Sequence, residues 1–177
     1  MQGITEEEYA MKFCMLIILD ERKVSGMDKY AENFKYILES YKKVIKSHPG
    51  MVINDISPKE GSNEYKDQVC KLTELCKVGN INLILRQGNI TQSAMFSLLI
   101  EAIYRTMILV RYYAPDGDLL SEVLKESYCS SKELTEIQLC RSLNISRATY
   151  YRRKQKGIMY AGYFFYEAVL PQMEGKI

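Results

Sequence analysis

Basic side chains concentrate in one short stretch of this 177-residue chain. Between Arg141 and Lys156 the sequence holds six basic residues and no acidic residue, although the whole chain carries a net charge of only +2. The six are Arg141, Arg147, Arg152, Arg153, Lys154 and Lys156. Because guanidinium and ammonium groups bind phosphate oxygens, a local basic block on a nearly neutral protein predicts a surface that faces a polyanion. The plainer alternative is a solvated helix face, which a charge run alone does not exclude.

Other reactive side chains are scattered and form no recognisable catalytic group. The single histidine, His48, lies in a His-Pro-Gly sequence that is typical of the end of a helix. Five cysteines without a C-x-x-C pair argue against a zinc site and favour reduced thiols in a cytoplasmic protein. There is no phosphate-binding loop of the G-x-x-x-x-G-K-[ST] type. We therefore expect no metal, no cofactor and no enzymatic activity, with an enzyme of unrecognised site as the remaining alternative.

The basic block overlaps a pattern for two helices joined by a tight turn. Thr135 and Gln138 have the spacing of a capping box, which predicts a first helix over about Glu136 to Leu143. Asn144 stands where the turn needs a left-handed backbone, a conformation that asparagine tolerates well. Ser146 is a suitable N-cap for the second helix. Together these positions predict a helix-turn-helix.

The remaining positions of this unit predict which side of the second helix is exposed. Cys140 is the small residue that a close helix crossing requires, Ile145 fills the angle between the helices, and Tyr150 points inward. At 100° per residue, Arg152 then lies at the centre of the outward face. The residues expected on or beside that face, and therefore at the DNA, are Ser146, Arg147, Ala148, Thr149, Tyr151, Arg152, Arg153, Gln155 and Lys156. Such a face, with arginines, hydroxyls and a small residue, suits the major groove of duplex DNA.

The run from Ile145 to Arg152, followed by Lys154 and Ile158, resembles the C-terminal part of phage and prophage late-gene regulators of the ArpU and RinA type. Those regulators are in turn similar to region four of sigma factors. The resemblance extends over residues 118 to 170 and does not reach the first hundred residues. It implies a transcription regulator that binds promoter-proximal DNA and contacts RNA polymerase. The matching positions imply that Ser146, Arg147, Thr149, Tyr151 and Arg152 face the DNA.

Two features depart from that resemblance. Gly157 and Gly162 fall inside the continued second helix, where each is expected to cost about 1 kcal/mol relative to alanine and to disturb its straightness. The N-terminal part also lacks the acidic and aromatic pattern of a sigma factor's core-binding region. A complete sigma factor is therefore not expected.

Hydrophobic spacing predicts helices along the rest of the chain, and hence an all-α fold. The expected helices cover Thr5 to Arg22, Asp28 to Ser47, Asn63 to Val78, Thr91 to Tyr113 and Leu119 to Tyr128, and the helix that starts at Ser146 is expected to end at Pro171. Residues Ile81 to Leu85 could form a strand or a helical turn. We expect an N-terminal helical bundle over residues 1–115, of unknown role, and a DNA-binding helix-turn-helix region with an extended last helix over residues 116–177.

Duplex DNA is the expected partner, and RNA polymerase a further one. The alternative is a protein-interaction module whose helix-turn-helix contacts polymerase or another regulator without binding DNA. No apolar run approaches the ~20 residues of a membrane span, so no membrane association is expected. A homodimer is expected for two reasons. The helix from Thr91 to Tyr113 is apolar around much of its circumference, and paired helix-turn-helix units gain affinity from paired half-sites.

Overall fold

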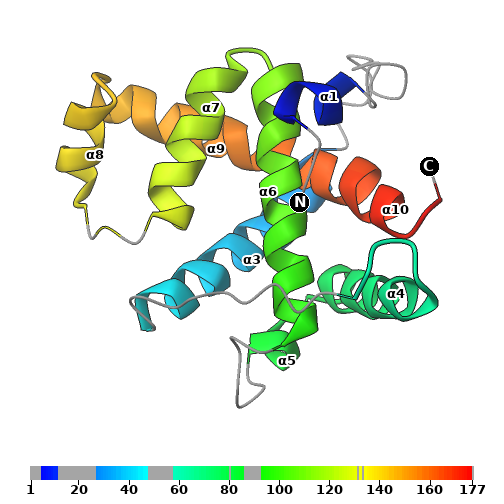
Figure 1. The fold of residues 1–177 in the computed structure, drawn as a ribbon. Coiled ribbons are helices and arrows are strands. Elements are labelled where there is room, and N and C mark those ends of the chain that lie inside the picture. The colour runs from blue at the N-terminus through cyan, green and yellow to red at the C-terminus, as the bar shows by residue number, and fades with distance from the viewer. Residues whose placement is uncertain are drawn as a thin grey trace.

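The computed structural model describes residues 5–11, 27–47, 58–79, 81–85, 93–130, 132 and 134–176, and these are helical with no strand among them. The all-α prediction is therefore confirmed (Figure 1). In chain order the helices are α1 (Glu6–Met11), α3 (Asp28–Ser47), α4 (Asn63–Lys77), α5 (Asn82–Leu85), α6 (Ala94–Tyr113), α7 (Gly117–Leu124), α8 (Glu136–Ser142), α9 (Arg147–Phe164) and α10 (Leu170–Met173). Two π-helical turns, Lys125–Cys129 and Phe165–Val169, follow α7 and α9.

Most predicted helix boundaries agree with the structure. The helix predicted over Asp28–Ser47 is found with those bounds, and Ile81 to Leu85 proves to be the helical alternative, since α5 occupies Asn82–Leu85. The helix predicted from Thr91 begins instead at Ala94, because Ser93 caps it by accepting a hydrogen bond from the Phe96 amide. The continuation of the first helix beyond Met11, the cysteine at position 14 and the His-Pro-Gly sequence at 48–50 lie outside the described residues.

Helix α6 is the central element of the fold. It is buried along almost its whole length and packs against α1, α4, α5, α7 and α9 (Figure 1). Arg105 of α6 is 4 % exposed, and its guanidinium donates to Glu101 at 2.5 Å, Glu60 at 3.1 Å and Gln172 at 2.7 Å. The neighbours of α6 within the chain thus account for its apolar circumference, one of the two reasons for expecting a dimer.

The C-terminal helix continues further than its sequence predicted. Pro171 was expected to end it, but α9, a π-helical turn and α10 follow one another directly as far as Met173. In the π-helical turn the Leu170 amide donates to the Phe165 carbonyl, five residues back. The backbone hydrogen bonds have therefore already changed from the α-helical to the π-helical spacing just before Pro171. Because the regular pattern is interrupted there, the missing N–H of the proline does not end the helix.

Gly157 and Gly162 do not interrupt α9; they allow other helices to approach it closely. A Cβ atom on Gly162 would lie 2.9 Å from the carbonyl oxygen of Tyr30 in α3. A Cβ atom on Gly157 would lie 3.1 Å from the Cγ atom of Leu124 in α7. Each glycine therefore has a packing role that offsets its low helix propensity.

Two clusters of buried side chains hold the molecule together. The larger contains Phe34 of α3, Phe96 of α6 and Phe164 of α9, and so draws on both sides of position 116. The smaller consists of Val123, Leu139, Cys140 and Tyr150, and joins α7, α8 and α9. The division into an N-terminal region, residues 1–115, and a C-terminal region, residues 116–177, stays a prediction.

Candidate nucleic-acid interface

The turn between α8 and α9 has the local geometry that its residues predicted. The Gln138 amide donates to the Thr135 hydroxyl at 3.3 Å, and the Thr135 amide donates to the Gln138 side-chain oxygen at 2.8 Å, which completes the capping box. Asn144 has φ = 50°, so its predicted left-handed conformation is confirmed. Ser146 caps α9 by accepting a hydrogen bond of 3.1 Å from the Thr149 amide. Local chemistry thus sets both helix starts and the reversal between them.

Tyr150 fixes the rotation of α9 about its own axis. It is 1 % exposed and packs with Leu139, Cys140 and Val123, as its predicted inward position requires. Its phenol lies 2.8 Å from the Ser127 hydroxyl, and burial raises the pKa of Tyr150 above its ordinary value. With this side buried, the opposite side of the first turns of α9 faces outward.

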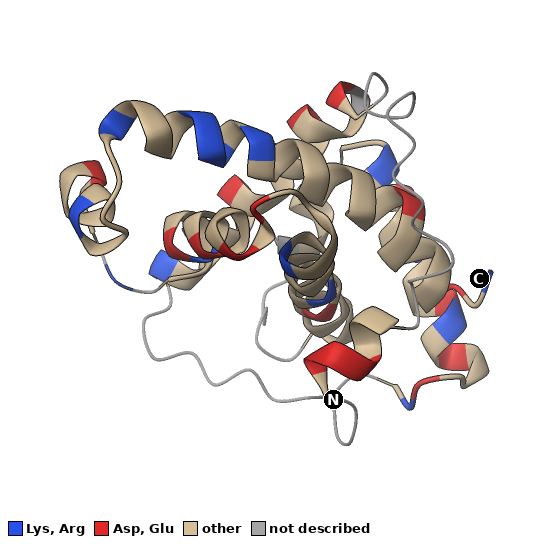
Figure 2. Cartoon of the chain, turned by 90° about the horizontal axis from the view of Figure 1, so that it is seen from above, with Lys and Arg blue, Asp and Glu red and all other residues tan. Residues whose placement is uncertain are grey.

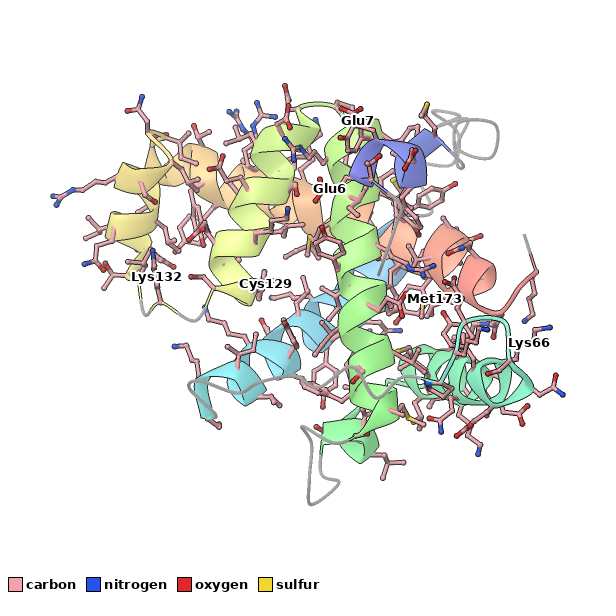
Figure 3. All side chains as sticks on the ribbon, in the orientation of Figure 1. Glu6, Glu7, Lys66, Cys129, Lys132 and Met173 are labelled. Atoms are coloured by element: carbon pink, nitrogen blue, oxygen red, sulfur yellow. The ribbon has the colours of Figure 1, made fainter. Side chains whose placement is uncertain are left out.

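That outward side carries most of the predicted DNA-contacting residues. The side chain of Arg147 is 67 % exposed, and Ala148, Arg152 and Gln155 are exposed as well. Ser146 is also exposed, while Thr149 is half-buried. Figure 2 shows basic residues recurring along the N-terminal half of α9 and acidic residues gathered on α1. In Figure 3, Glu6 and Glu7 of α1 are far from Lys132, which precedes α8.

Three basic residues of α9 are less available than the sequence suggested. Arg153 turns toward α7, where its guanidinium pairs with Asp116 and its side chain is only 22 % exposed. Lys156 is half-buried, with its ammonium 5.9 Å from the ring centre of Tyr160. Lys154 is half-buried and places its ammonium 4.9 Å from the ring centre of Tyr128 and 5.6 Å from that of Tyr150. Burial lowers the pKa of Lys154.

An acidic side chain, Glu136, was missed by the sequence reading. It accepts hydrogen bonds from Tyr151 at 2.5 Å and from Arg147 at 3.0 Å, and so links α8 to the start of α9. Hydrogen bonds from Tyr151 and then Arg147 lower the pKa of its carboxyl group. Its separation of 11 and 15 residues from these partners has no local periodicity, and an acid in the first turn of a helix is ordinary. Nothing in the sequence therefore distinguished it.

A groove of about 700 Å³ lies between α9 and α3. Its α9 wall includes Arg152, Lys154 and Lys156, and its α3 wall carries Asp28, Glu32 and Glu39 together with Lys35. Charges of both signs line the groove, so it is not a purely basic surface of the kind that a phosphate backbone favours. The usable surface is therefore the end of the molecule formed by α8 and the first turns of α9, opposite α4 and α10 (Figure 1).

No helix in the described part of the chain combines the length and hydropathy needed to cross a membrane. Within the same residues, no three or more His, Cys, Asp or Glu side chains gather in an arrangement that could hold a metal ion. Comparisons with protein-family models, with curated proteins and with solved structures found no match to this chain. The resemblance to ArpU- and RinA-type regulators stays a prediction that depends on the residues quoted for it.

Proposed function

We propose that this protein is a DNA-binding transcription regulator that places the first turns of α9 in the major groove of duplex DNA. The observation that carries the proposal is that α9 is fixed on one side by buried Tyr150, exposes Ala148 and Arg152 on the other, and exposes Arg147 at its N-terminal end. Ala148 lets the helix backbone approach the bases, while arginines can bind guanine edges or phosphates. α8 then lies across the DNA backbone, as the first helix of a helix-turn-helix does.

The interface we propose is narrower than the set expected from sequence. It contains Ser146, Arg147, Ala148, Thr149 and Arg152, with Tyr151 and Gln155 at its border with the groove. Arg153 is left out because it pairs with Asp116, and Lys156 is at most a peripheral phosphate contact. The phage late-gene role belongs to this proposal through the family resemblance, and the cytoplasmic location through the cysteines, which favour reduced thiols.

A protein-interaction role is the second candidate, and one observation favours it. Ile137 of α8 is 59 % exposed, and it lines a hollow of about 520 Å³ together with Ile145, Arg141 and Arg147. An apolar residue between two arginines suits an acidic protein segment that presents a large apolar side chain, and RNA polymerase is the partner that the family resemblance implies. This role is compatible with DNA binding if α8 contacts the protein while α9 contacts the DNA.

Selection from a random duplex pool, followed by a salt titration, tests the proposal. Regulatory DNA binding requires enrichment of a common sequence and a log–log salt dependence with a slope of about −0.9 for each phosphate contact. Arg147→Ala combined with Arg152→Ala must remove the enrichment, whereas Lys66→Ala and Lys71→Ala on α4, at the other end of the molecule, serve as a charge-matched control. Failure of the parent protein to bind any duplex at 50 mM salt would exclude the DNA-binding role and leave the interaction role.

Dimerisation remains part of the proposal on one of its two original grounds, since α6 is covered within the chain. Pairing of two half-sites about one helical turn apart would give two copies the affinity that one unit lacks. Light scattering of the protein with and without a selected duplex checks this. A strict 1:1 complex on a duplex without sequence symmetry would exclude the dimer.

A further inference from the structure

The carboxylate of Glu136 is hydrogen-bonded to two side chains that the proposed interface needs, Arg147 and Tyr151. Its carboxylate oxygens accept one hydrogen bond from the Arg147 guanidinium at 3.0 Å and one from the Tyr151 phenol at 2.5 Å. The Arg147 guanidinium also lies 5.9 Å from the ring centre of Tyr151. The three side chains form a connected group on the surface where α8 meets α9, and we call it the Glu136 cluster.

The cluster changes what Arg147 and Tyr151 can offer to DNA. A phenol has one proton to donate, and Tyr151 donates it to Glu136, so its oxygen is left only as an acceptor, which a phosphate oxygen does not bind. The positive charge of Arg147 is balanced by the adjacent carboxylate. Phosphate binding by either side chain therefore requires that it first leave Glu136.

Stability does not explain this arrangement. Arg147 and Tyr151 are exposed, and an exposed ion pair contributes little to folding. Glu136 stands in the first turn of α8, where an acid gains from the helix dipole, but that gain requires neither Arg147 nor Tyr151. A carboxylate beside a predicted phosphate-binding arginine also repels the DNA backbone. The contacts of Glu136 with Arg147 and Tyr151 therefore matter mainly for how this surface binds DNA.

We propose that Glu136 limits the affinity of this surface for DNA by holding Arg147 and Tyr151 away from phosphates. This rests on the proposed function. On arbitrary DNA, phosphate contacts supply essentially all of the binding, so the cost of separating Arg147 and Tyr151 from Glu136 falls on the whole interaction. On a preferred sequence, base contacts from Arg152 and its neighbours add affinity, and the same cost of freeing Arg147 and Tyr151 is paid.

Fluorescence anisotropy with two 30-base-pair probes tests this, one of fixed random sequence and one selected by the parent protein. Glu136→Ala should bind the random probe about two- to fivefold more tightly, the factor equivalent to one exposed ion pair. Its log–log salt slope should be more negative by about one, because Arg147 then binds phosphate without first giving up a carboxylate. Affinity for the selected probe should rise by a similar factor. Glu74→Ala on α4 makes the same charge change at the other end of the molecule and should alter neither slope.

A double-mutant cycle shows which side chains carry the effect of Glu136 on DNA binding. Tyr151→Phe removes the phenol proton that Glu136 accepts, so it should change random-probe affinity less in the parent than in the Glu136→Ala background. In the Glu136→Ala background the same change should cancel part of the gain, and Arg147→Ala should cancel the rest. If Glu136→Ala lowers the helical circular dichroism signal, Glu136→Gln replaces it, since glutamine removes the charge while keeping the side-chain length.

The outcomes separate the two proposals. A parent protein that binds neither probe overturns the proposed function and this inference with it. A parent that binds both probes, with Glu136→Ala equal to Glu74→Ala in affinity and slope, overturns the role of Glu136 alone. Weaker binding of the random probe by Glu136→Ala also overturns it, since Glu136 would then support DNA contact instead of limiting it.

Discussion

The phenol of Tyr150 and the hydroxyl of Ser127 lie 2.8 Å apart in a site that excludes water. Ser127 belongs to the π-helical turn after α7, and Tyr150 to the second turn of α9, so this hydrogen bond joins the two helices that border α8. Because Tyr150 is also the centre of the smaller buried cluster, the bond sets how the candidate interface is presented.

Truncation of Tyr150 should destabilise the protein strongly. We expect Tyr150→Ala to lower the free energy of unfolding by about 3–5 kcal/mol through loss of a buried aromatic ring. Tyr150→Phe should cost about 1 kcal/mol, because it removes one hydrogen bond and leaves the Ser127 hydroxyl without this partner. Urea unfolding followed by circular dichroism measures both. Equal stability of the parent and Tyr150→Ala would show that the assignment of the buried face is wrong.

The two glycines of α9 should respond differently to alanine. In Gly162→Ala the new Cβ atom meets the Tyr30 backbone at 2.9 Å, and backbone cannot move aside easily, so we expect a net loss of about 1–3 kcal/mol. In Gly157→Ala the neighbour is the Leu124 side chain, which can shift, and the gain of about 1 kcal/mol in helix propensity offsets the crowding. Thermal unfolding of both variants gives the comparison; a more stable Gly162→Ala would contradict the close approach of α3.

Lys154 should make stability depend on pH in the alkaline range. Burial is the largest effect and lowers the folded-state pKa of Lys154. The charges of Glu136 and Glu39 raise this pKa by less, and the charge of Lys35 lowers it further. Below the folded pKa the cost of burying the charge is fully present. As pH rises toward the unfolded value of about 10.4 the folded state loses its proton first, and the cost disappears. Lys154→Met keeps the packed stem without the charge, so its stability advantage over the parent should be larger at pH 7 than at pH 10.

Chemical unfolding of parent and Lys154→Met at the two pH values measures this difference. Tyrosine ionisation affects both proteins alike and cancels in the comparison. An advantage that grew with pH would indicate that contact with the Tyr128 and Tyr150 rings favours the charged lysine more than burial disfavours it.

Arginines on different sides of α9 should differ in their effect on DNA binding. Arg152→Ala should weaken binding to a selected duplex by about 1–3 kcal/mol and relax specificity at one base pair. Lys156→Ala should weaken binding to all sequences by the same factor. That factor should be smaller than the loss that Arg152→Ala causes on the selected duplex. Arg153→Ala should instead lower stability, because it leaves α9 without its pair to Asp116. Competition between selected and random duplexes distinguishes the three; loss of specificity in Arg153→Ala alone would place the DNA on the α7 side.

Local features of this protein were predictable from sequence because they depend on neighbours in the chain. The capping box of Thr135 and Gln138, the left-handed Asn144 and the inward Tyr150 each follow from side-chain chemistry within a few residues. The all-α class follows from periodicity in the same way. The start of α6 was displaced by three residues because Ser93 provides the cap.

Features that depend on distant elements were not predictable. Arg153 and Lys156 look alike on a helical wheel, and only the position of α7 shows that Arg153 is paired with Asp116. The packing role of Gly162 depends on α3, which is more than a hundred residues earlier in the chain. The Glu136 cluster joins residues from two helices whose relative rotation the sequence did not specify.

The position of α9 in the core also has a consequence for biosynthesis. α3 packs against α9, the Tyr166 phenol donates to the Cys76 carbonyl at 2.9 Å, and the Tyr9 phenol donates to Gln172 at 3.4 Å. A nascent chain that has emerged from the ribosome only as far as α8 therefore lacks the surface that covers the apolar side of α3. Such contacts between distant residues close large loops and slow folding. The core should consequently form after translation of α9, and chaperones that bind exposed apolar segments should engage this protein before that point.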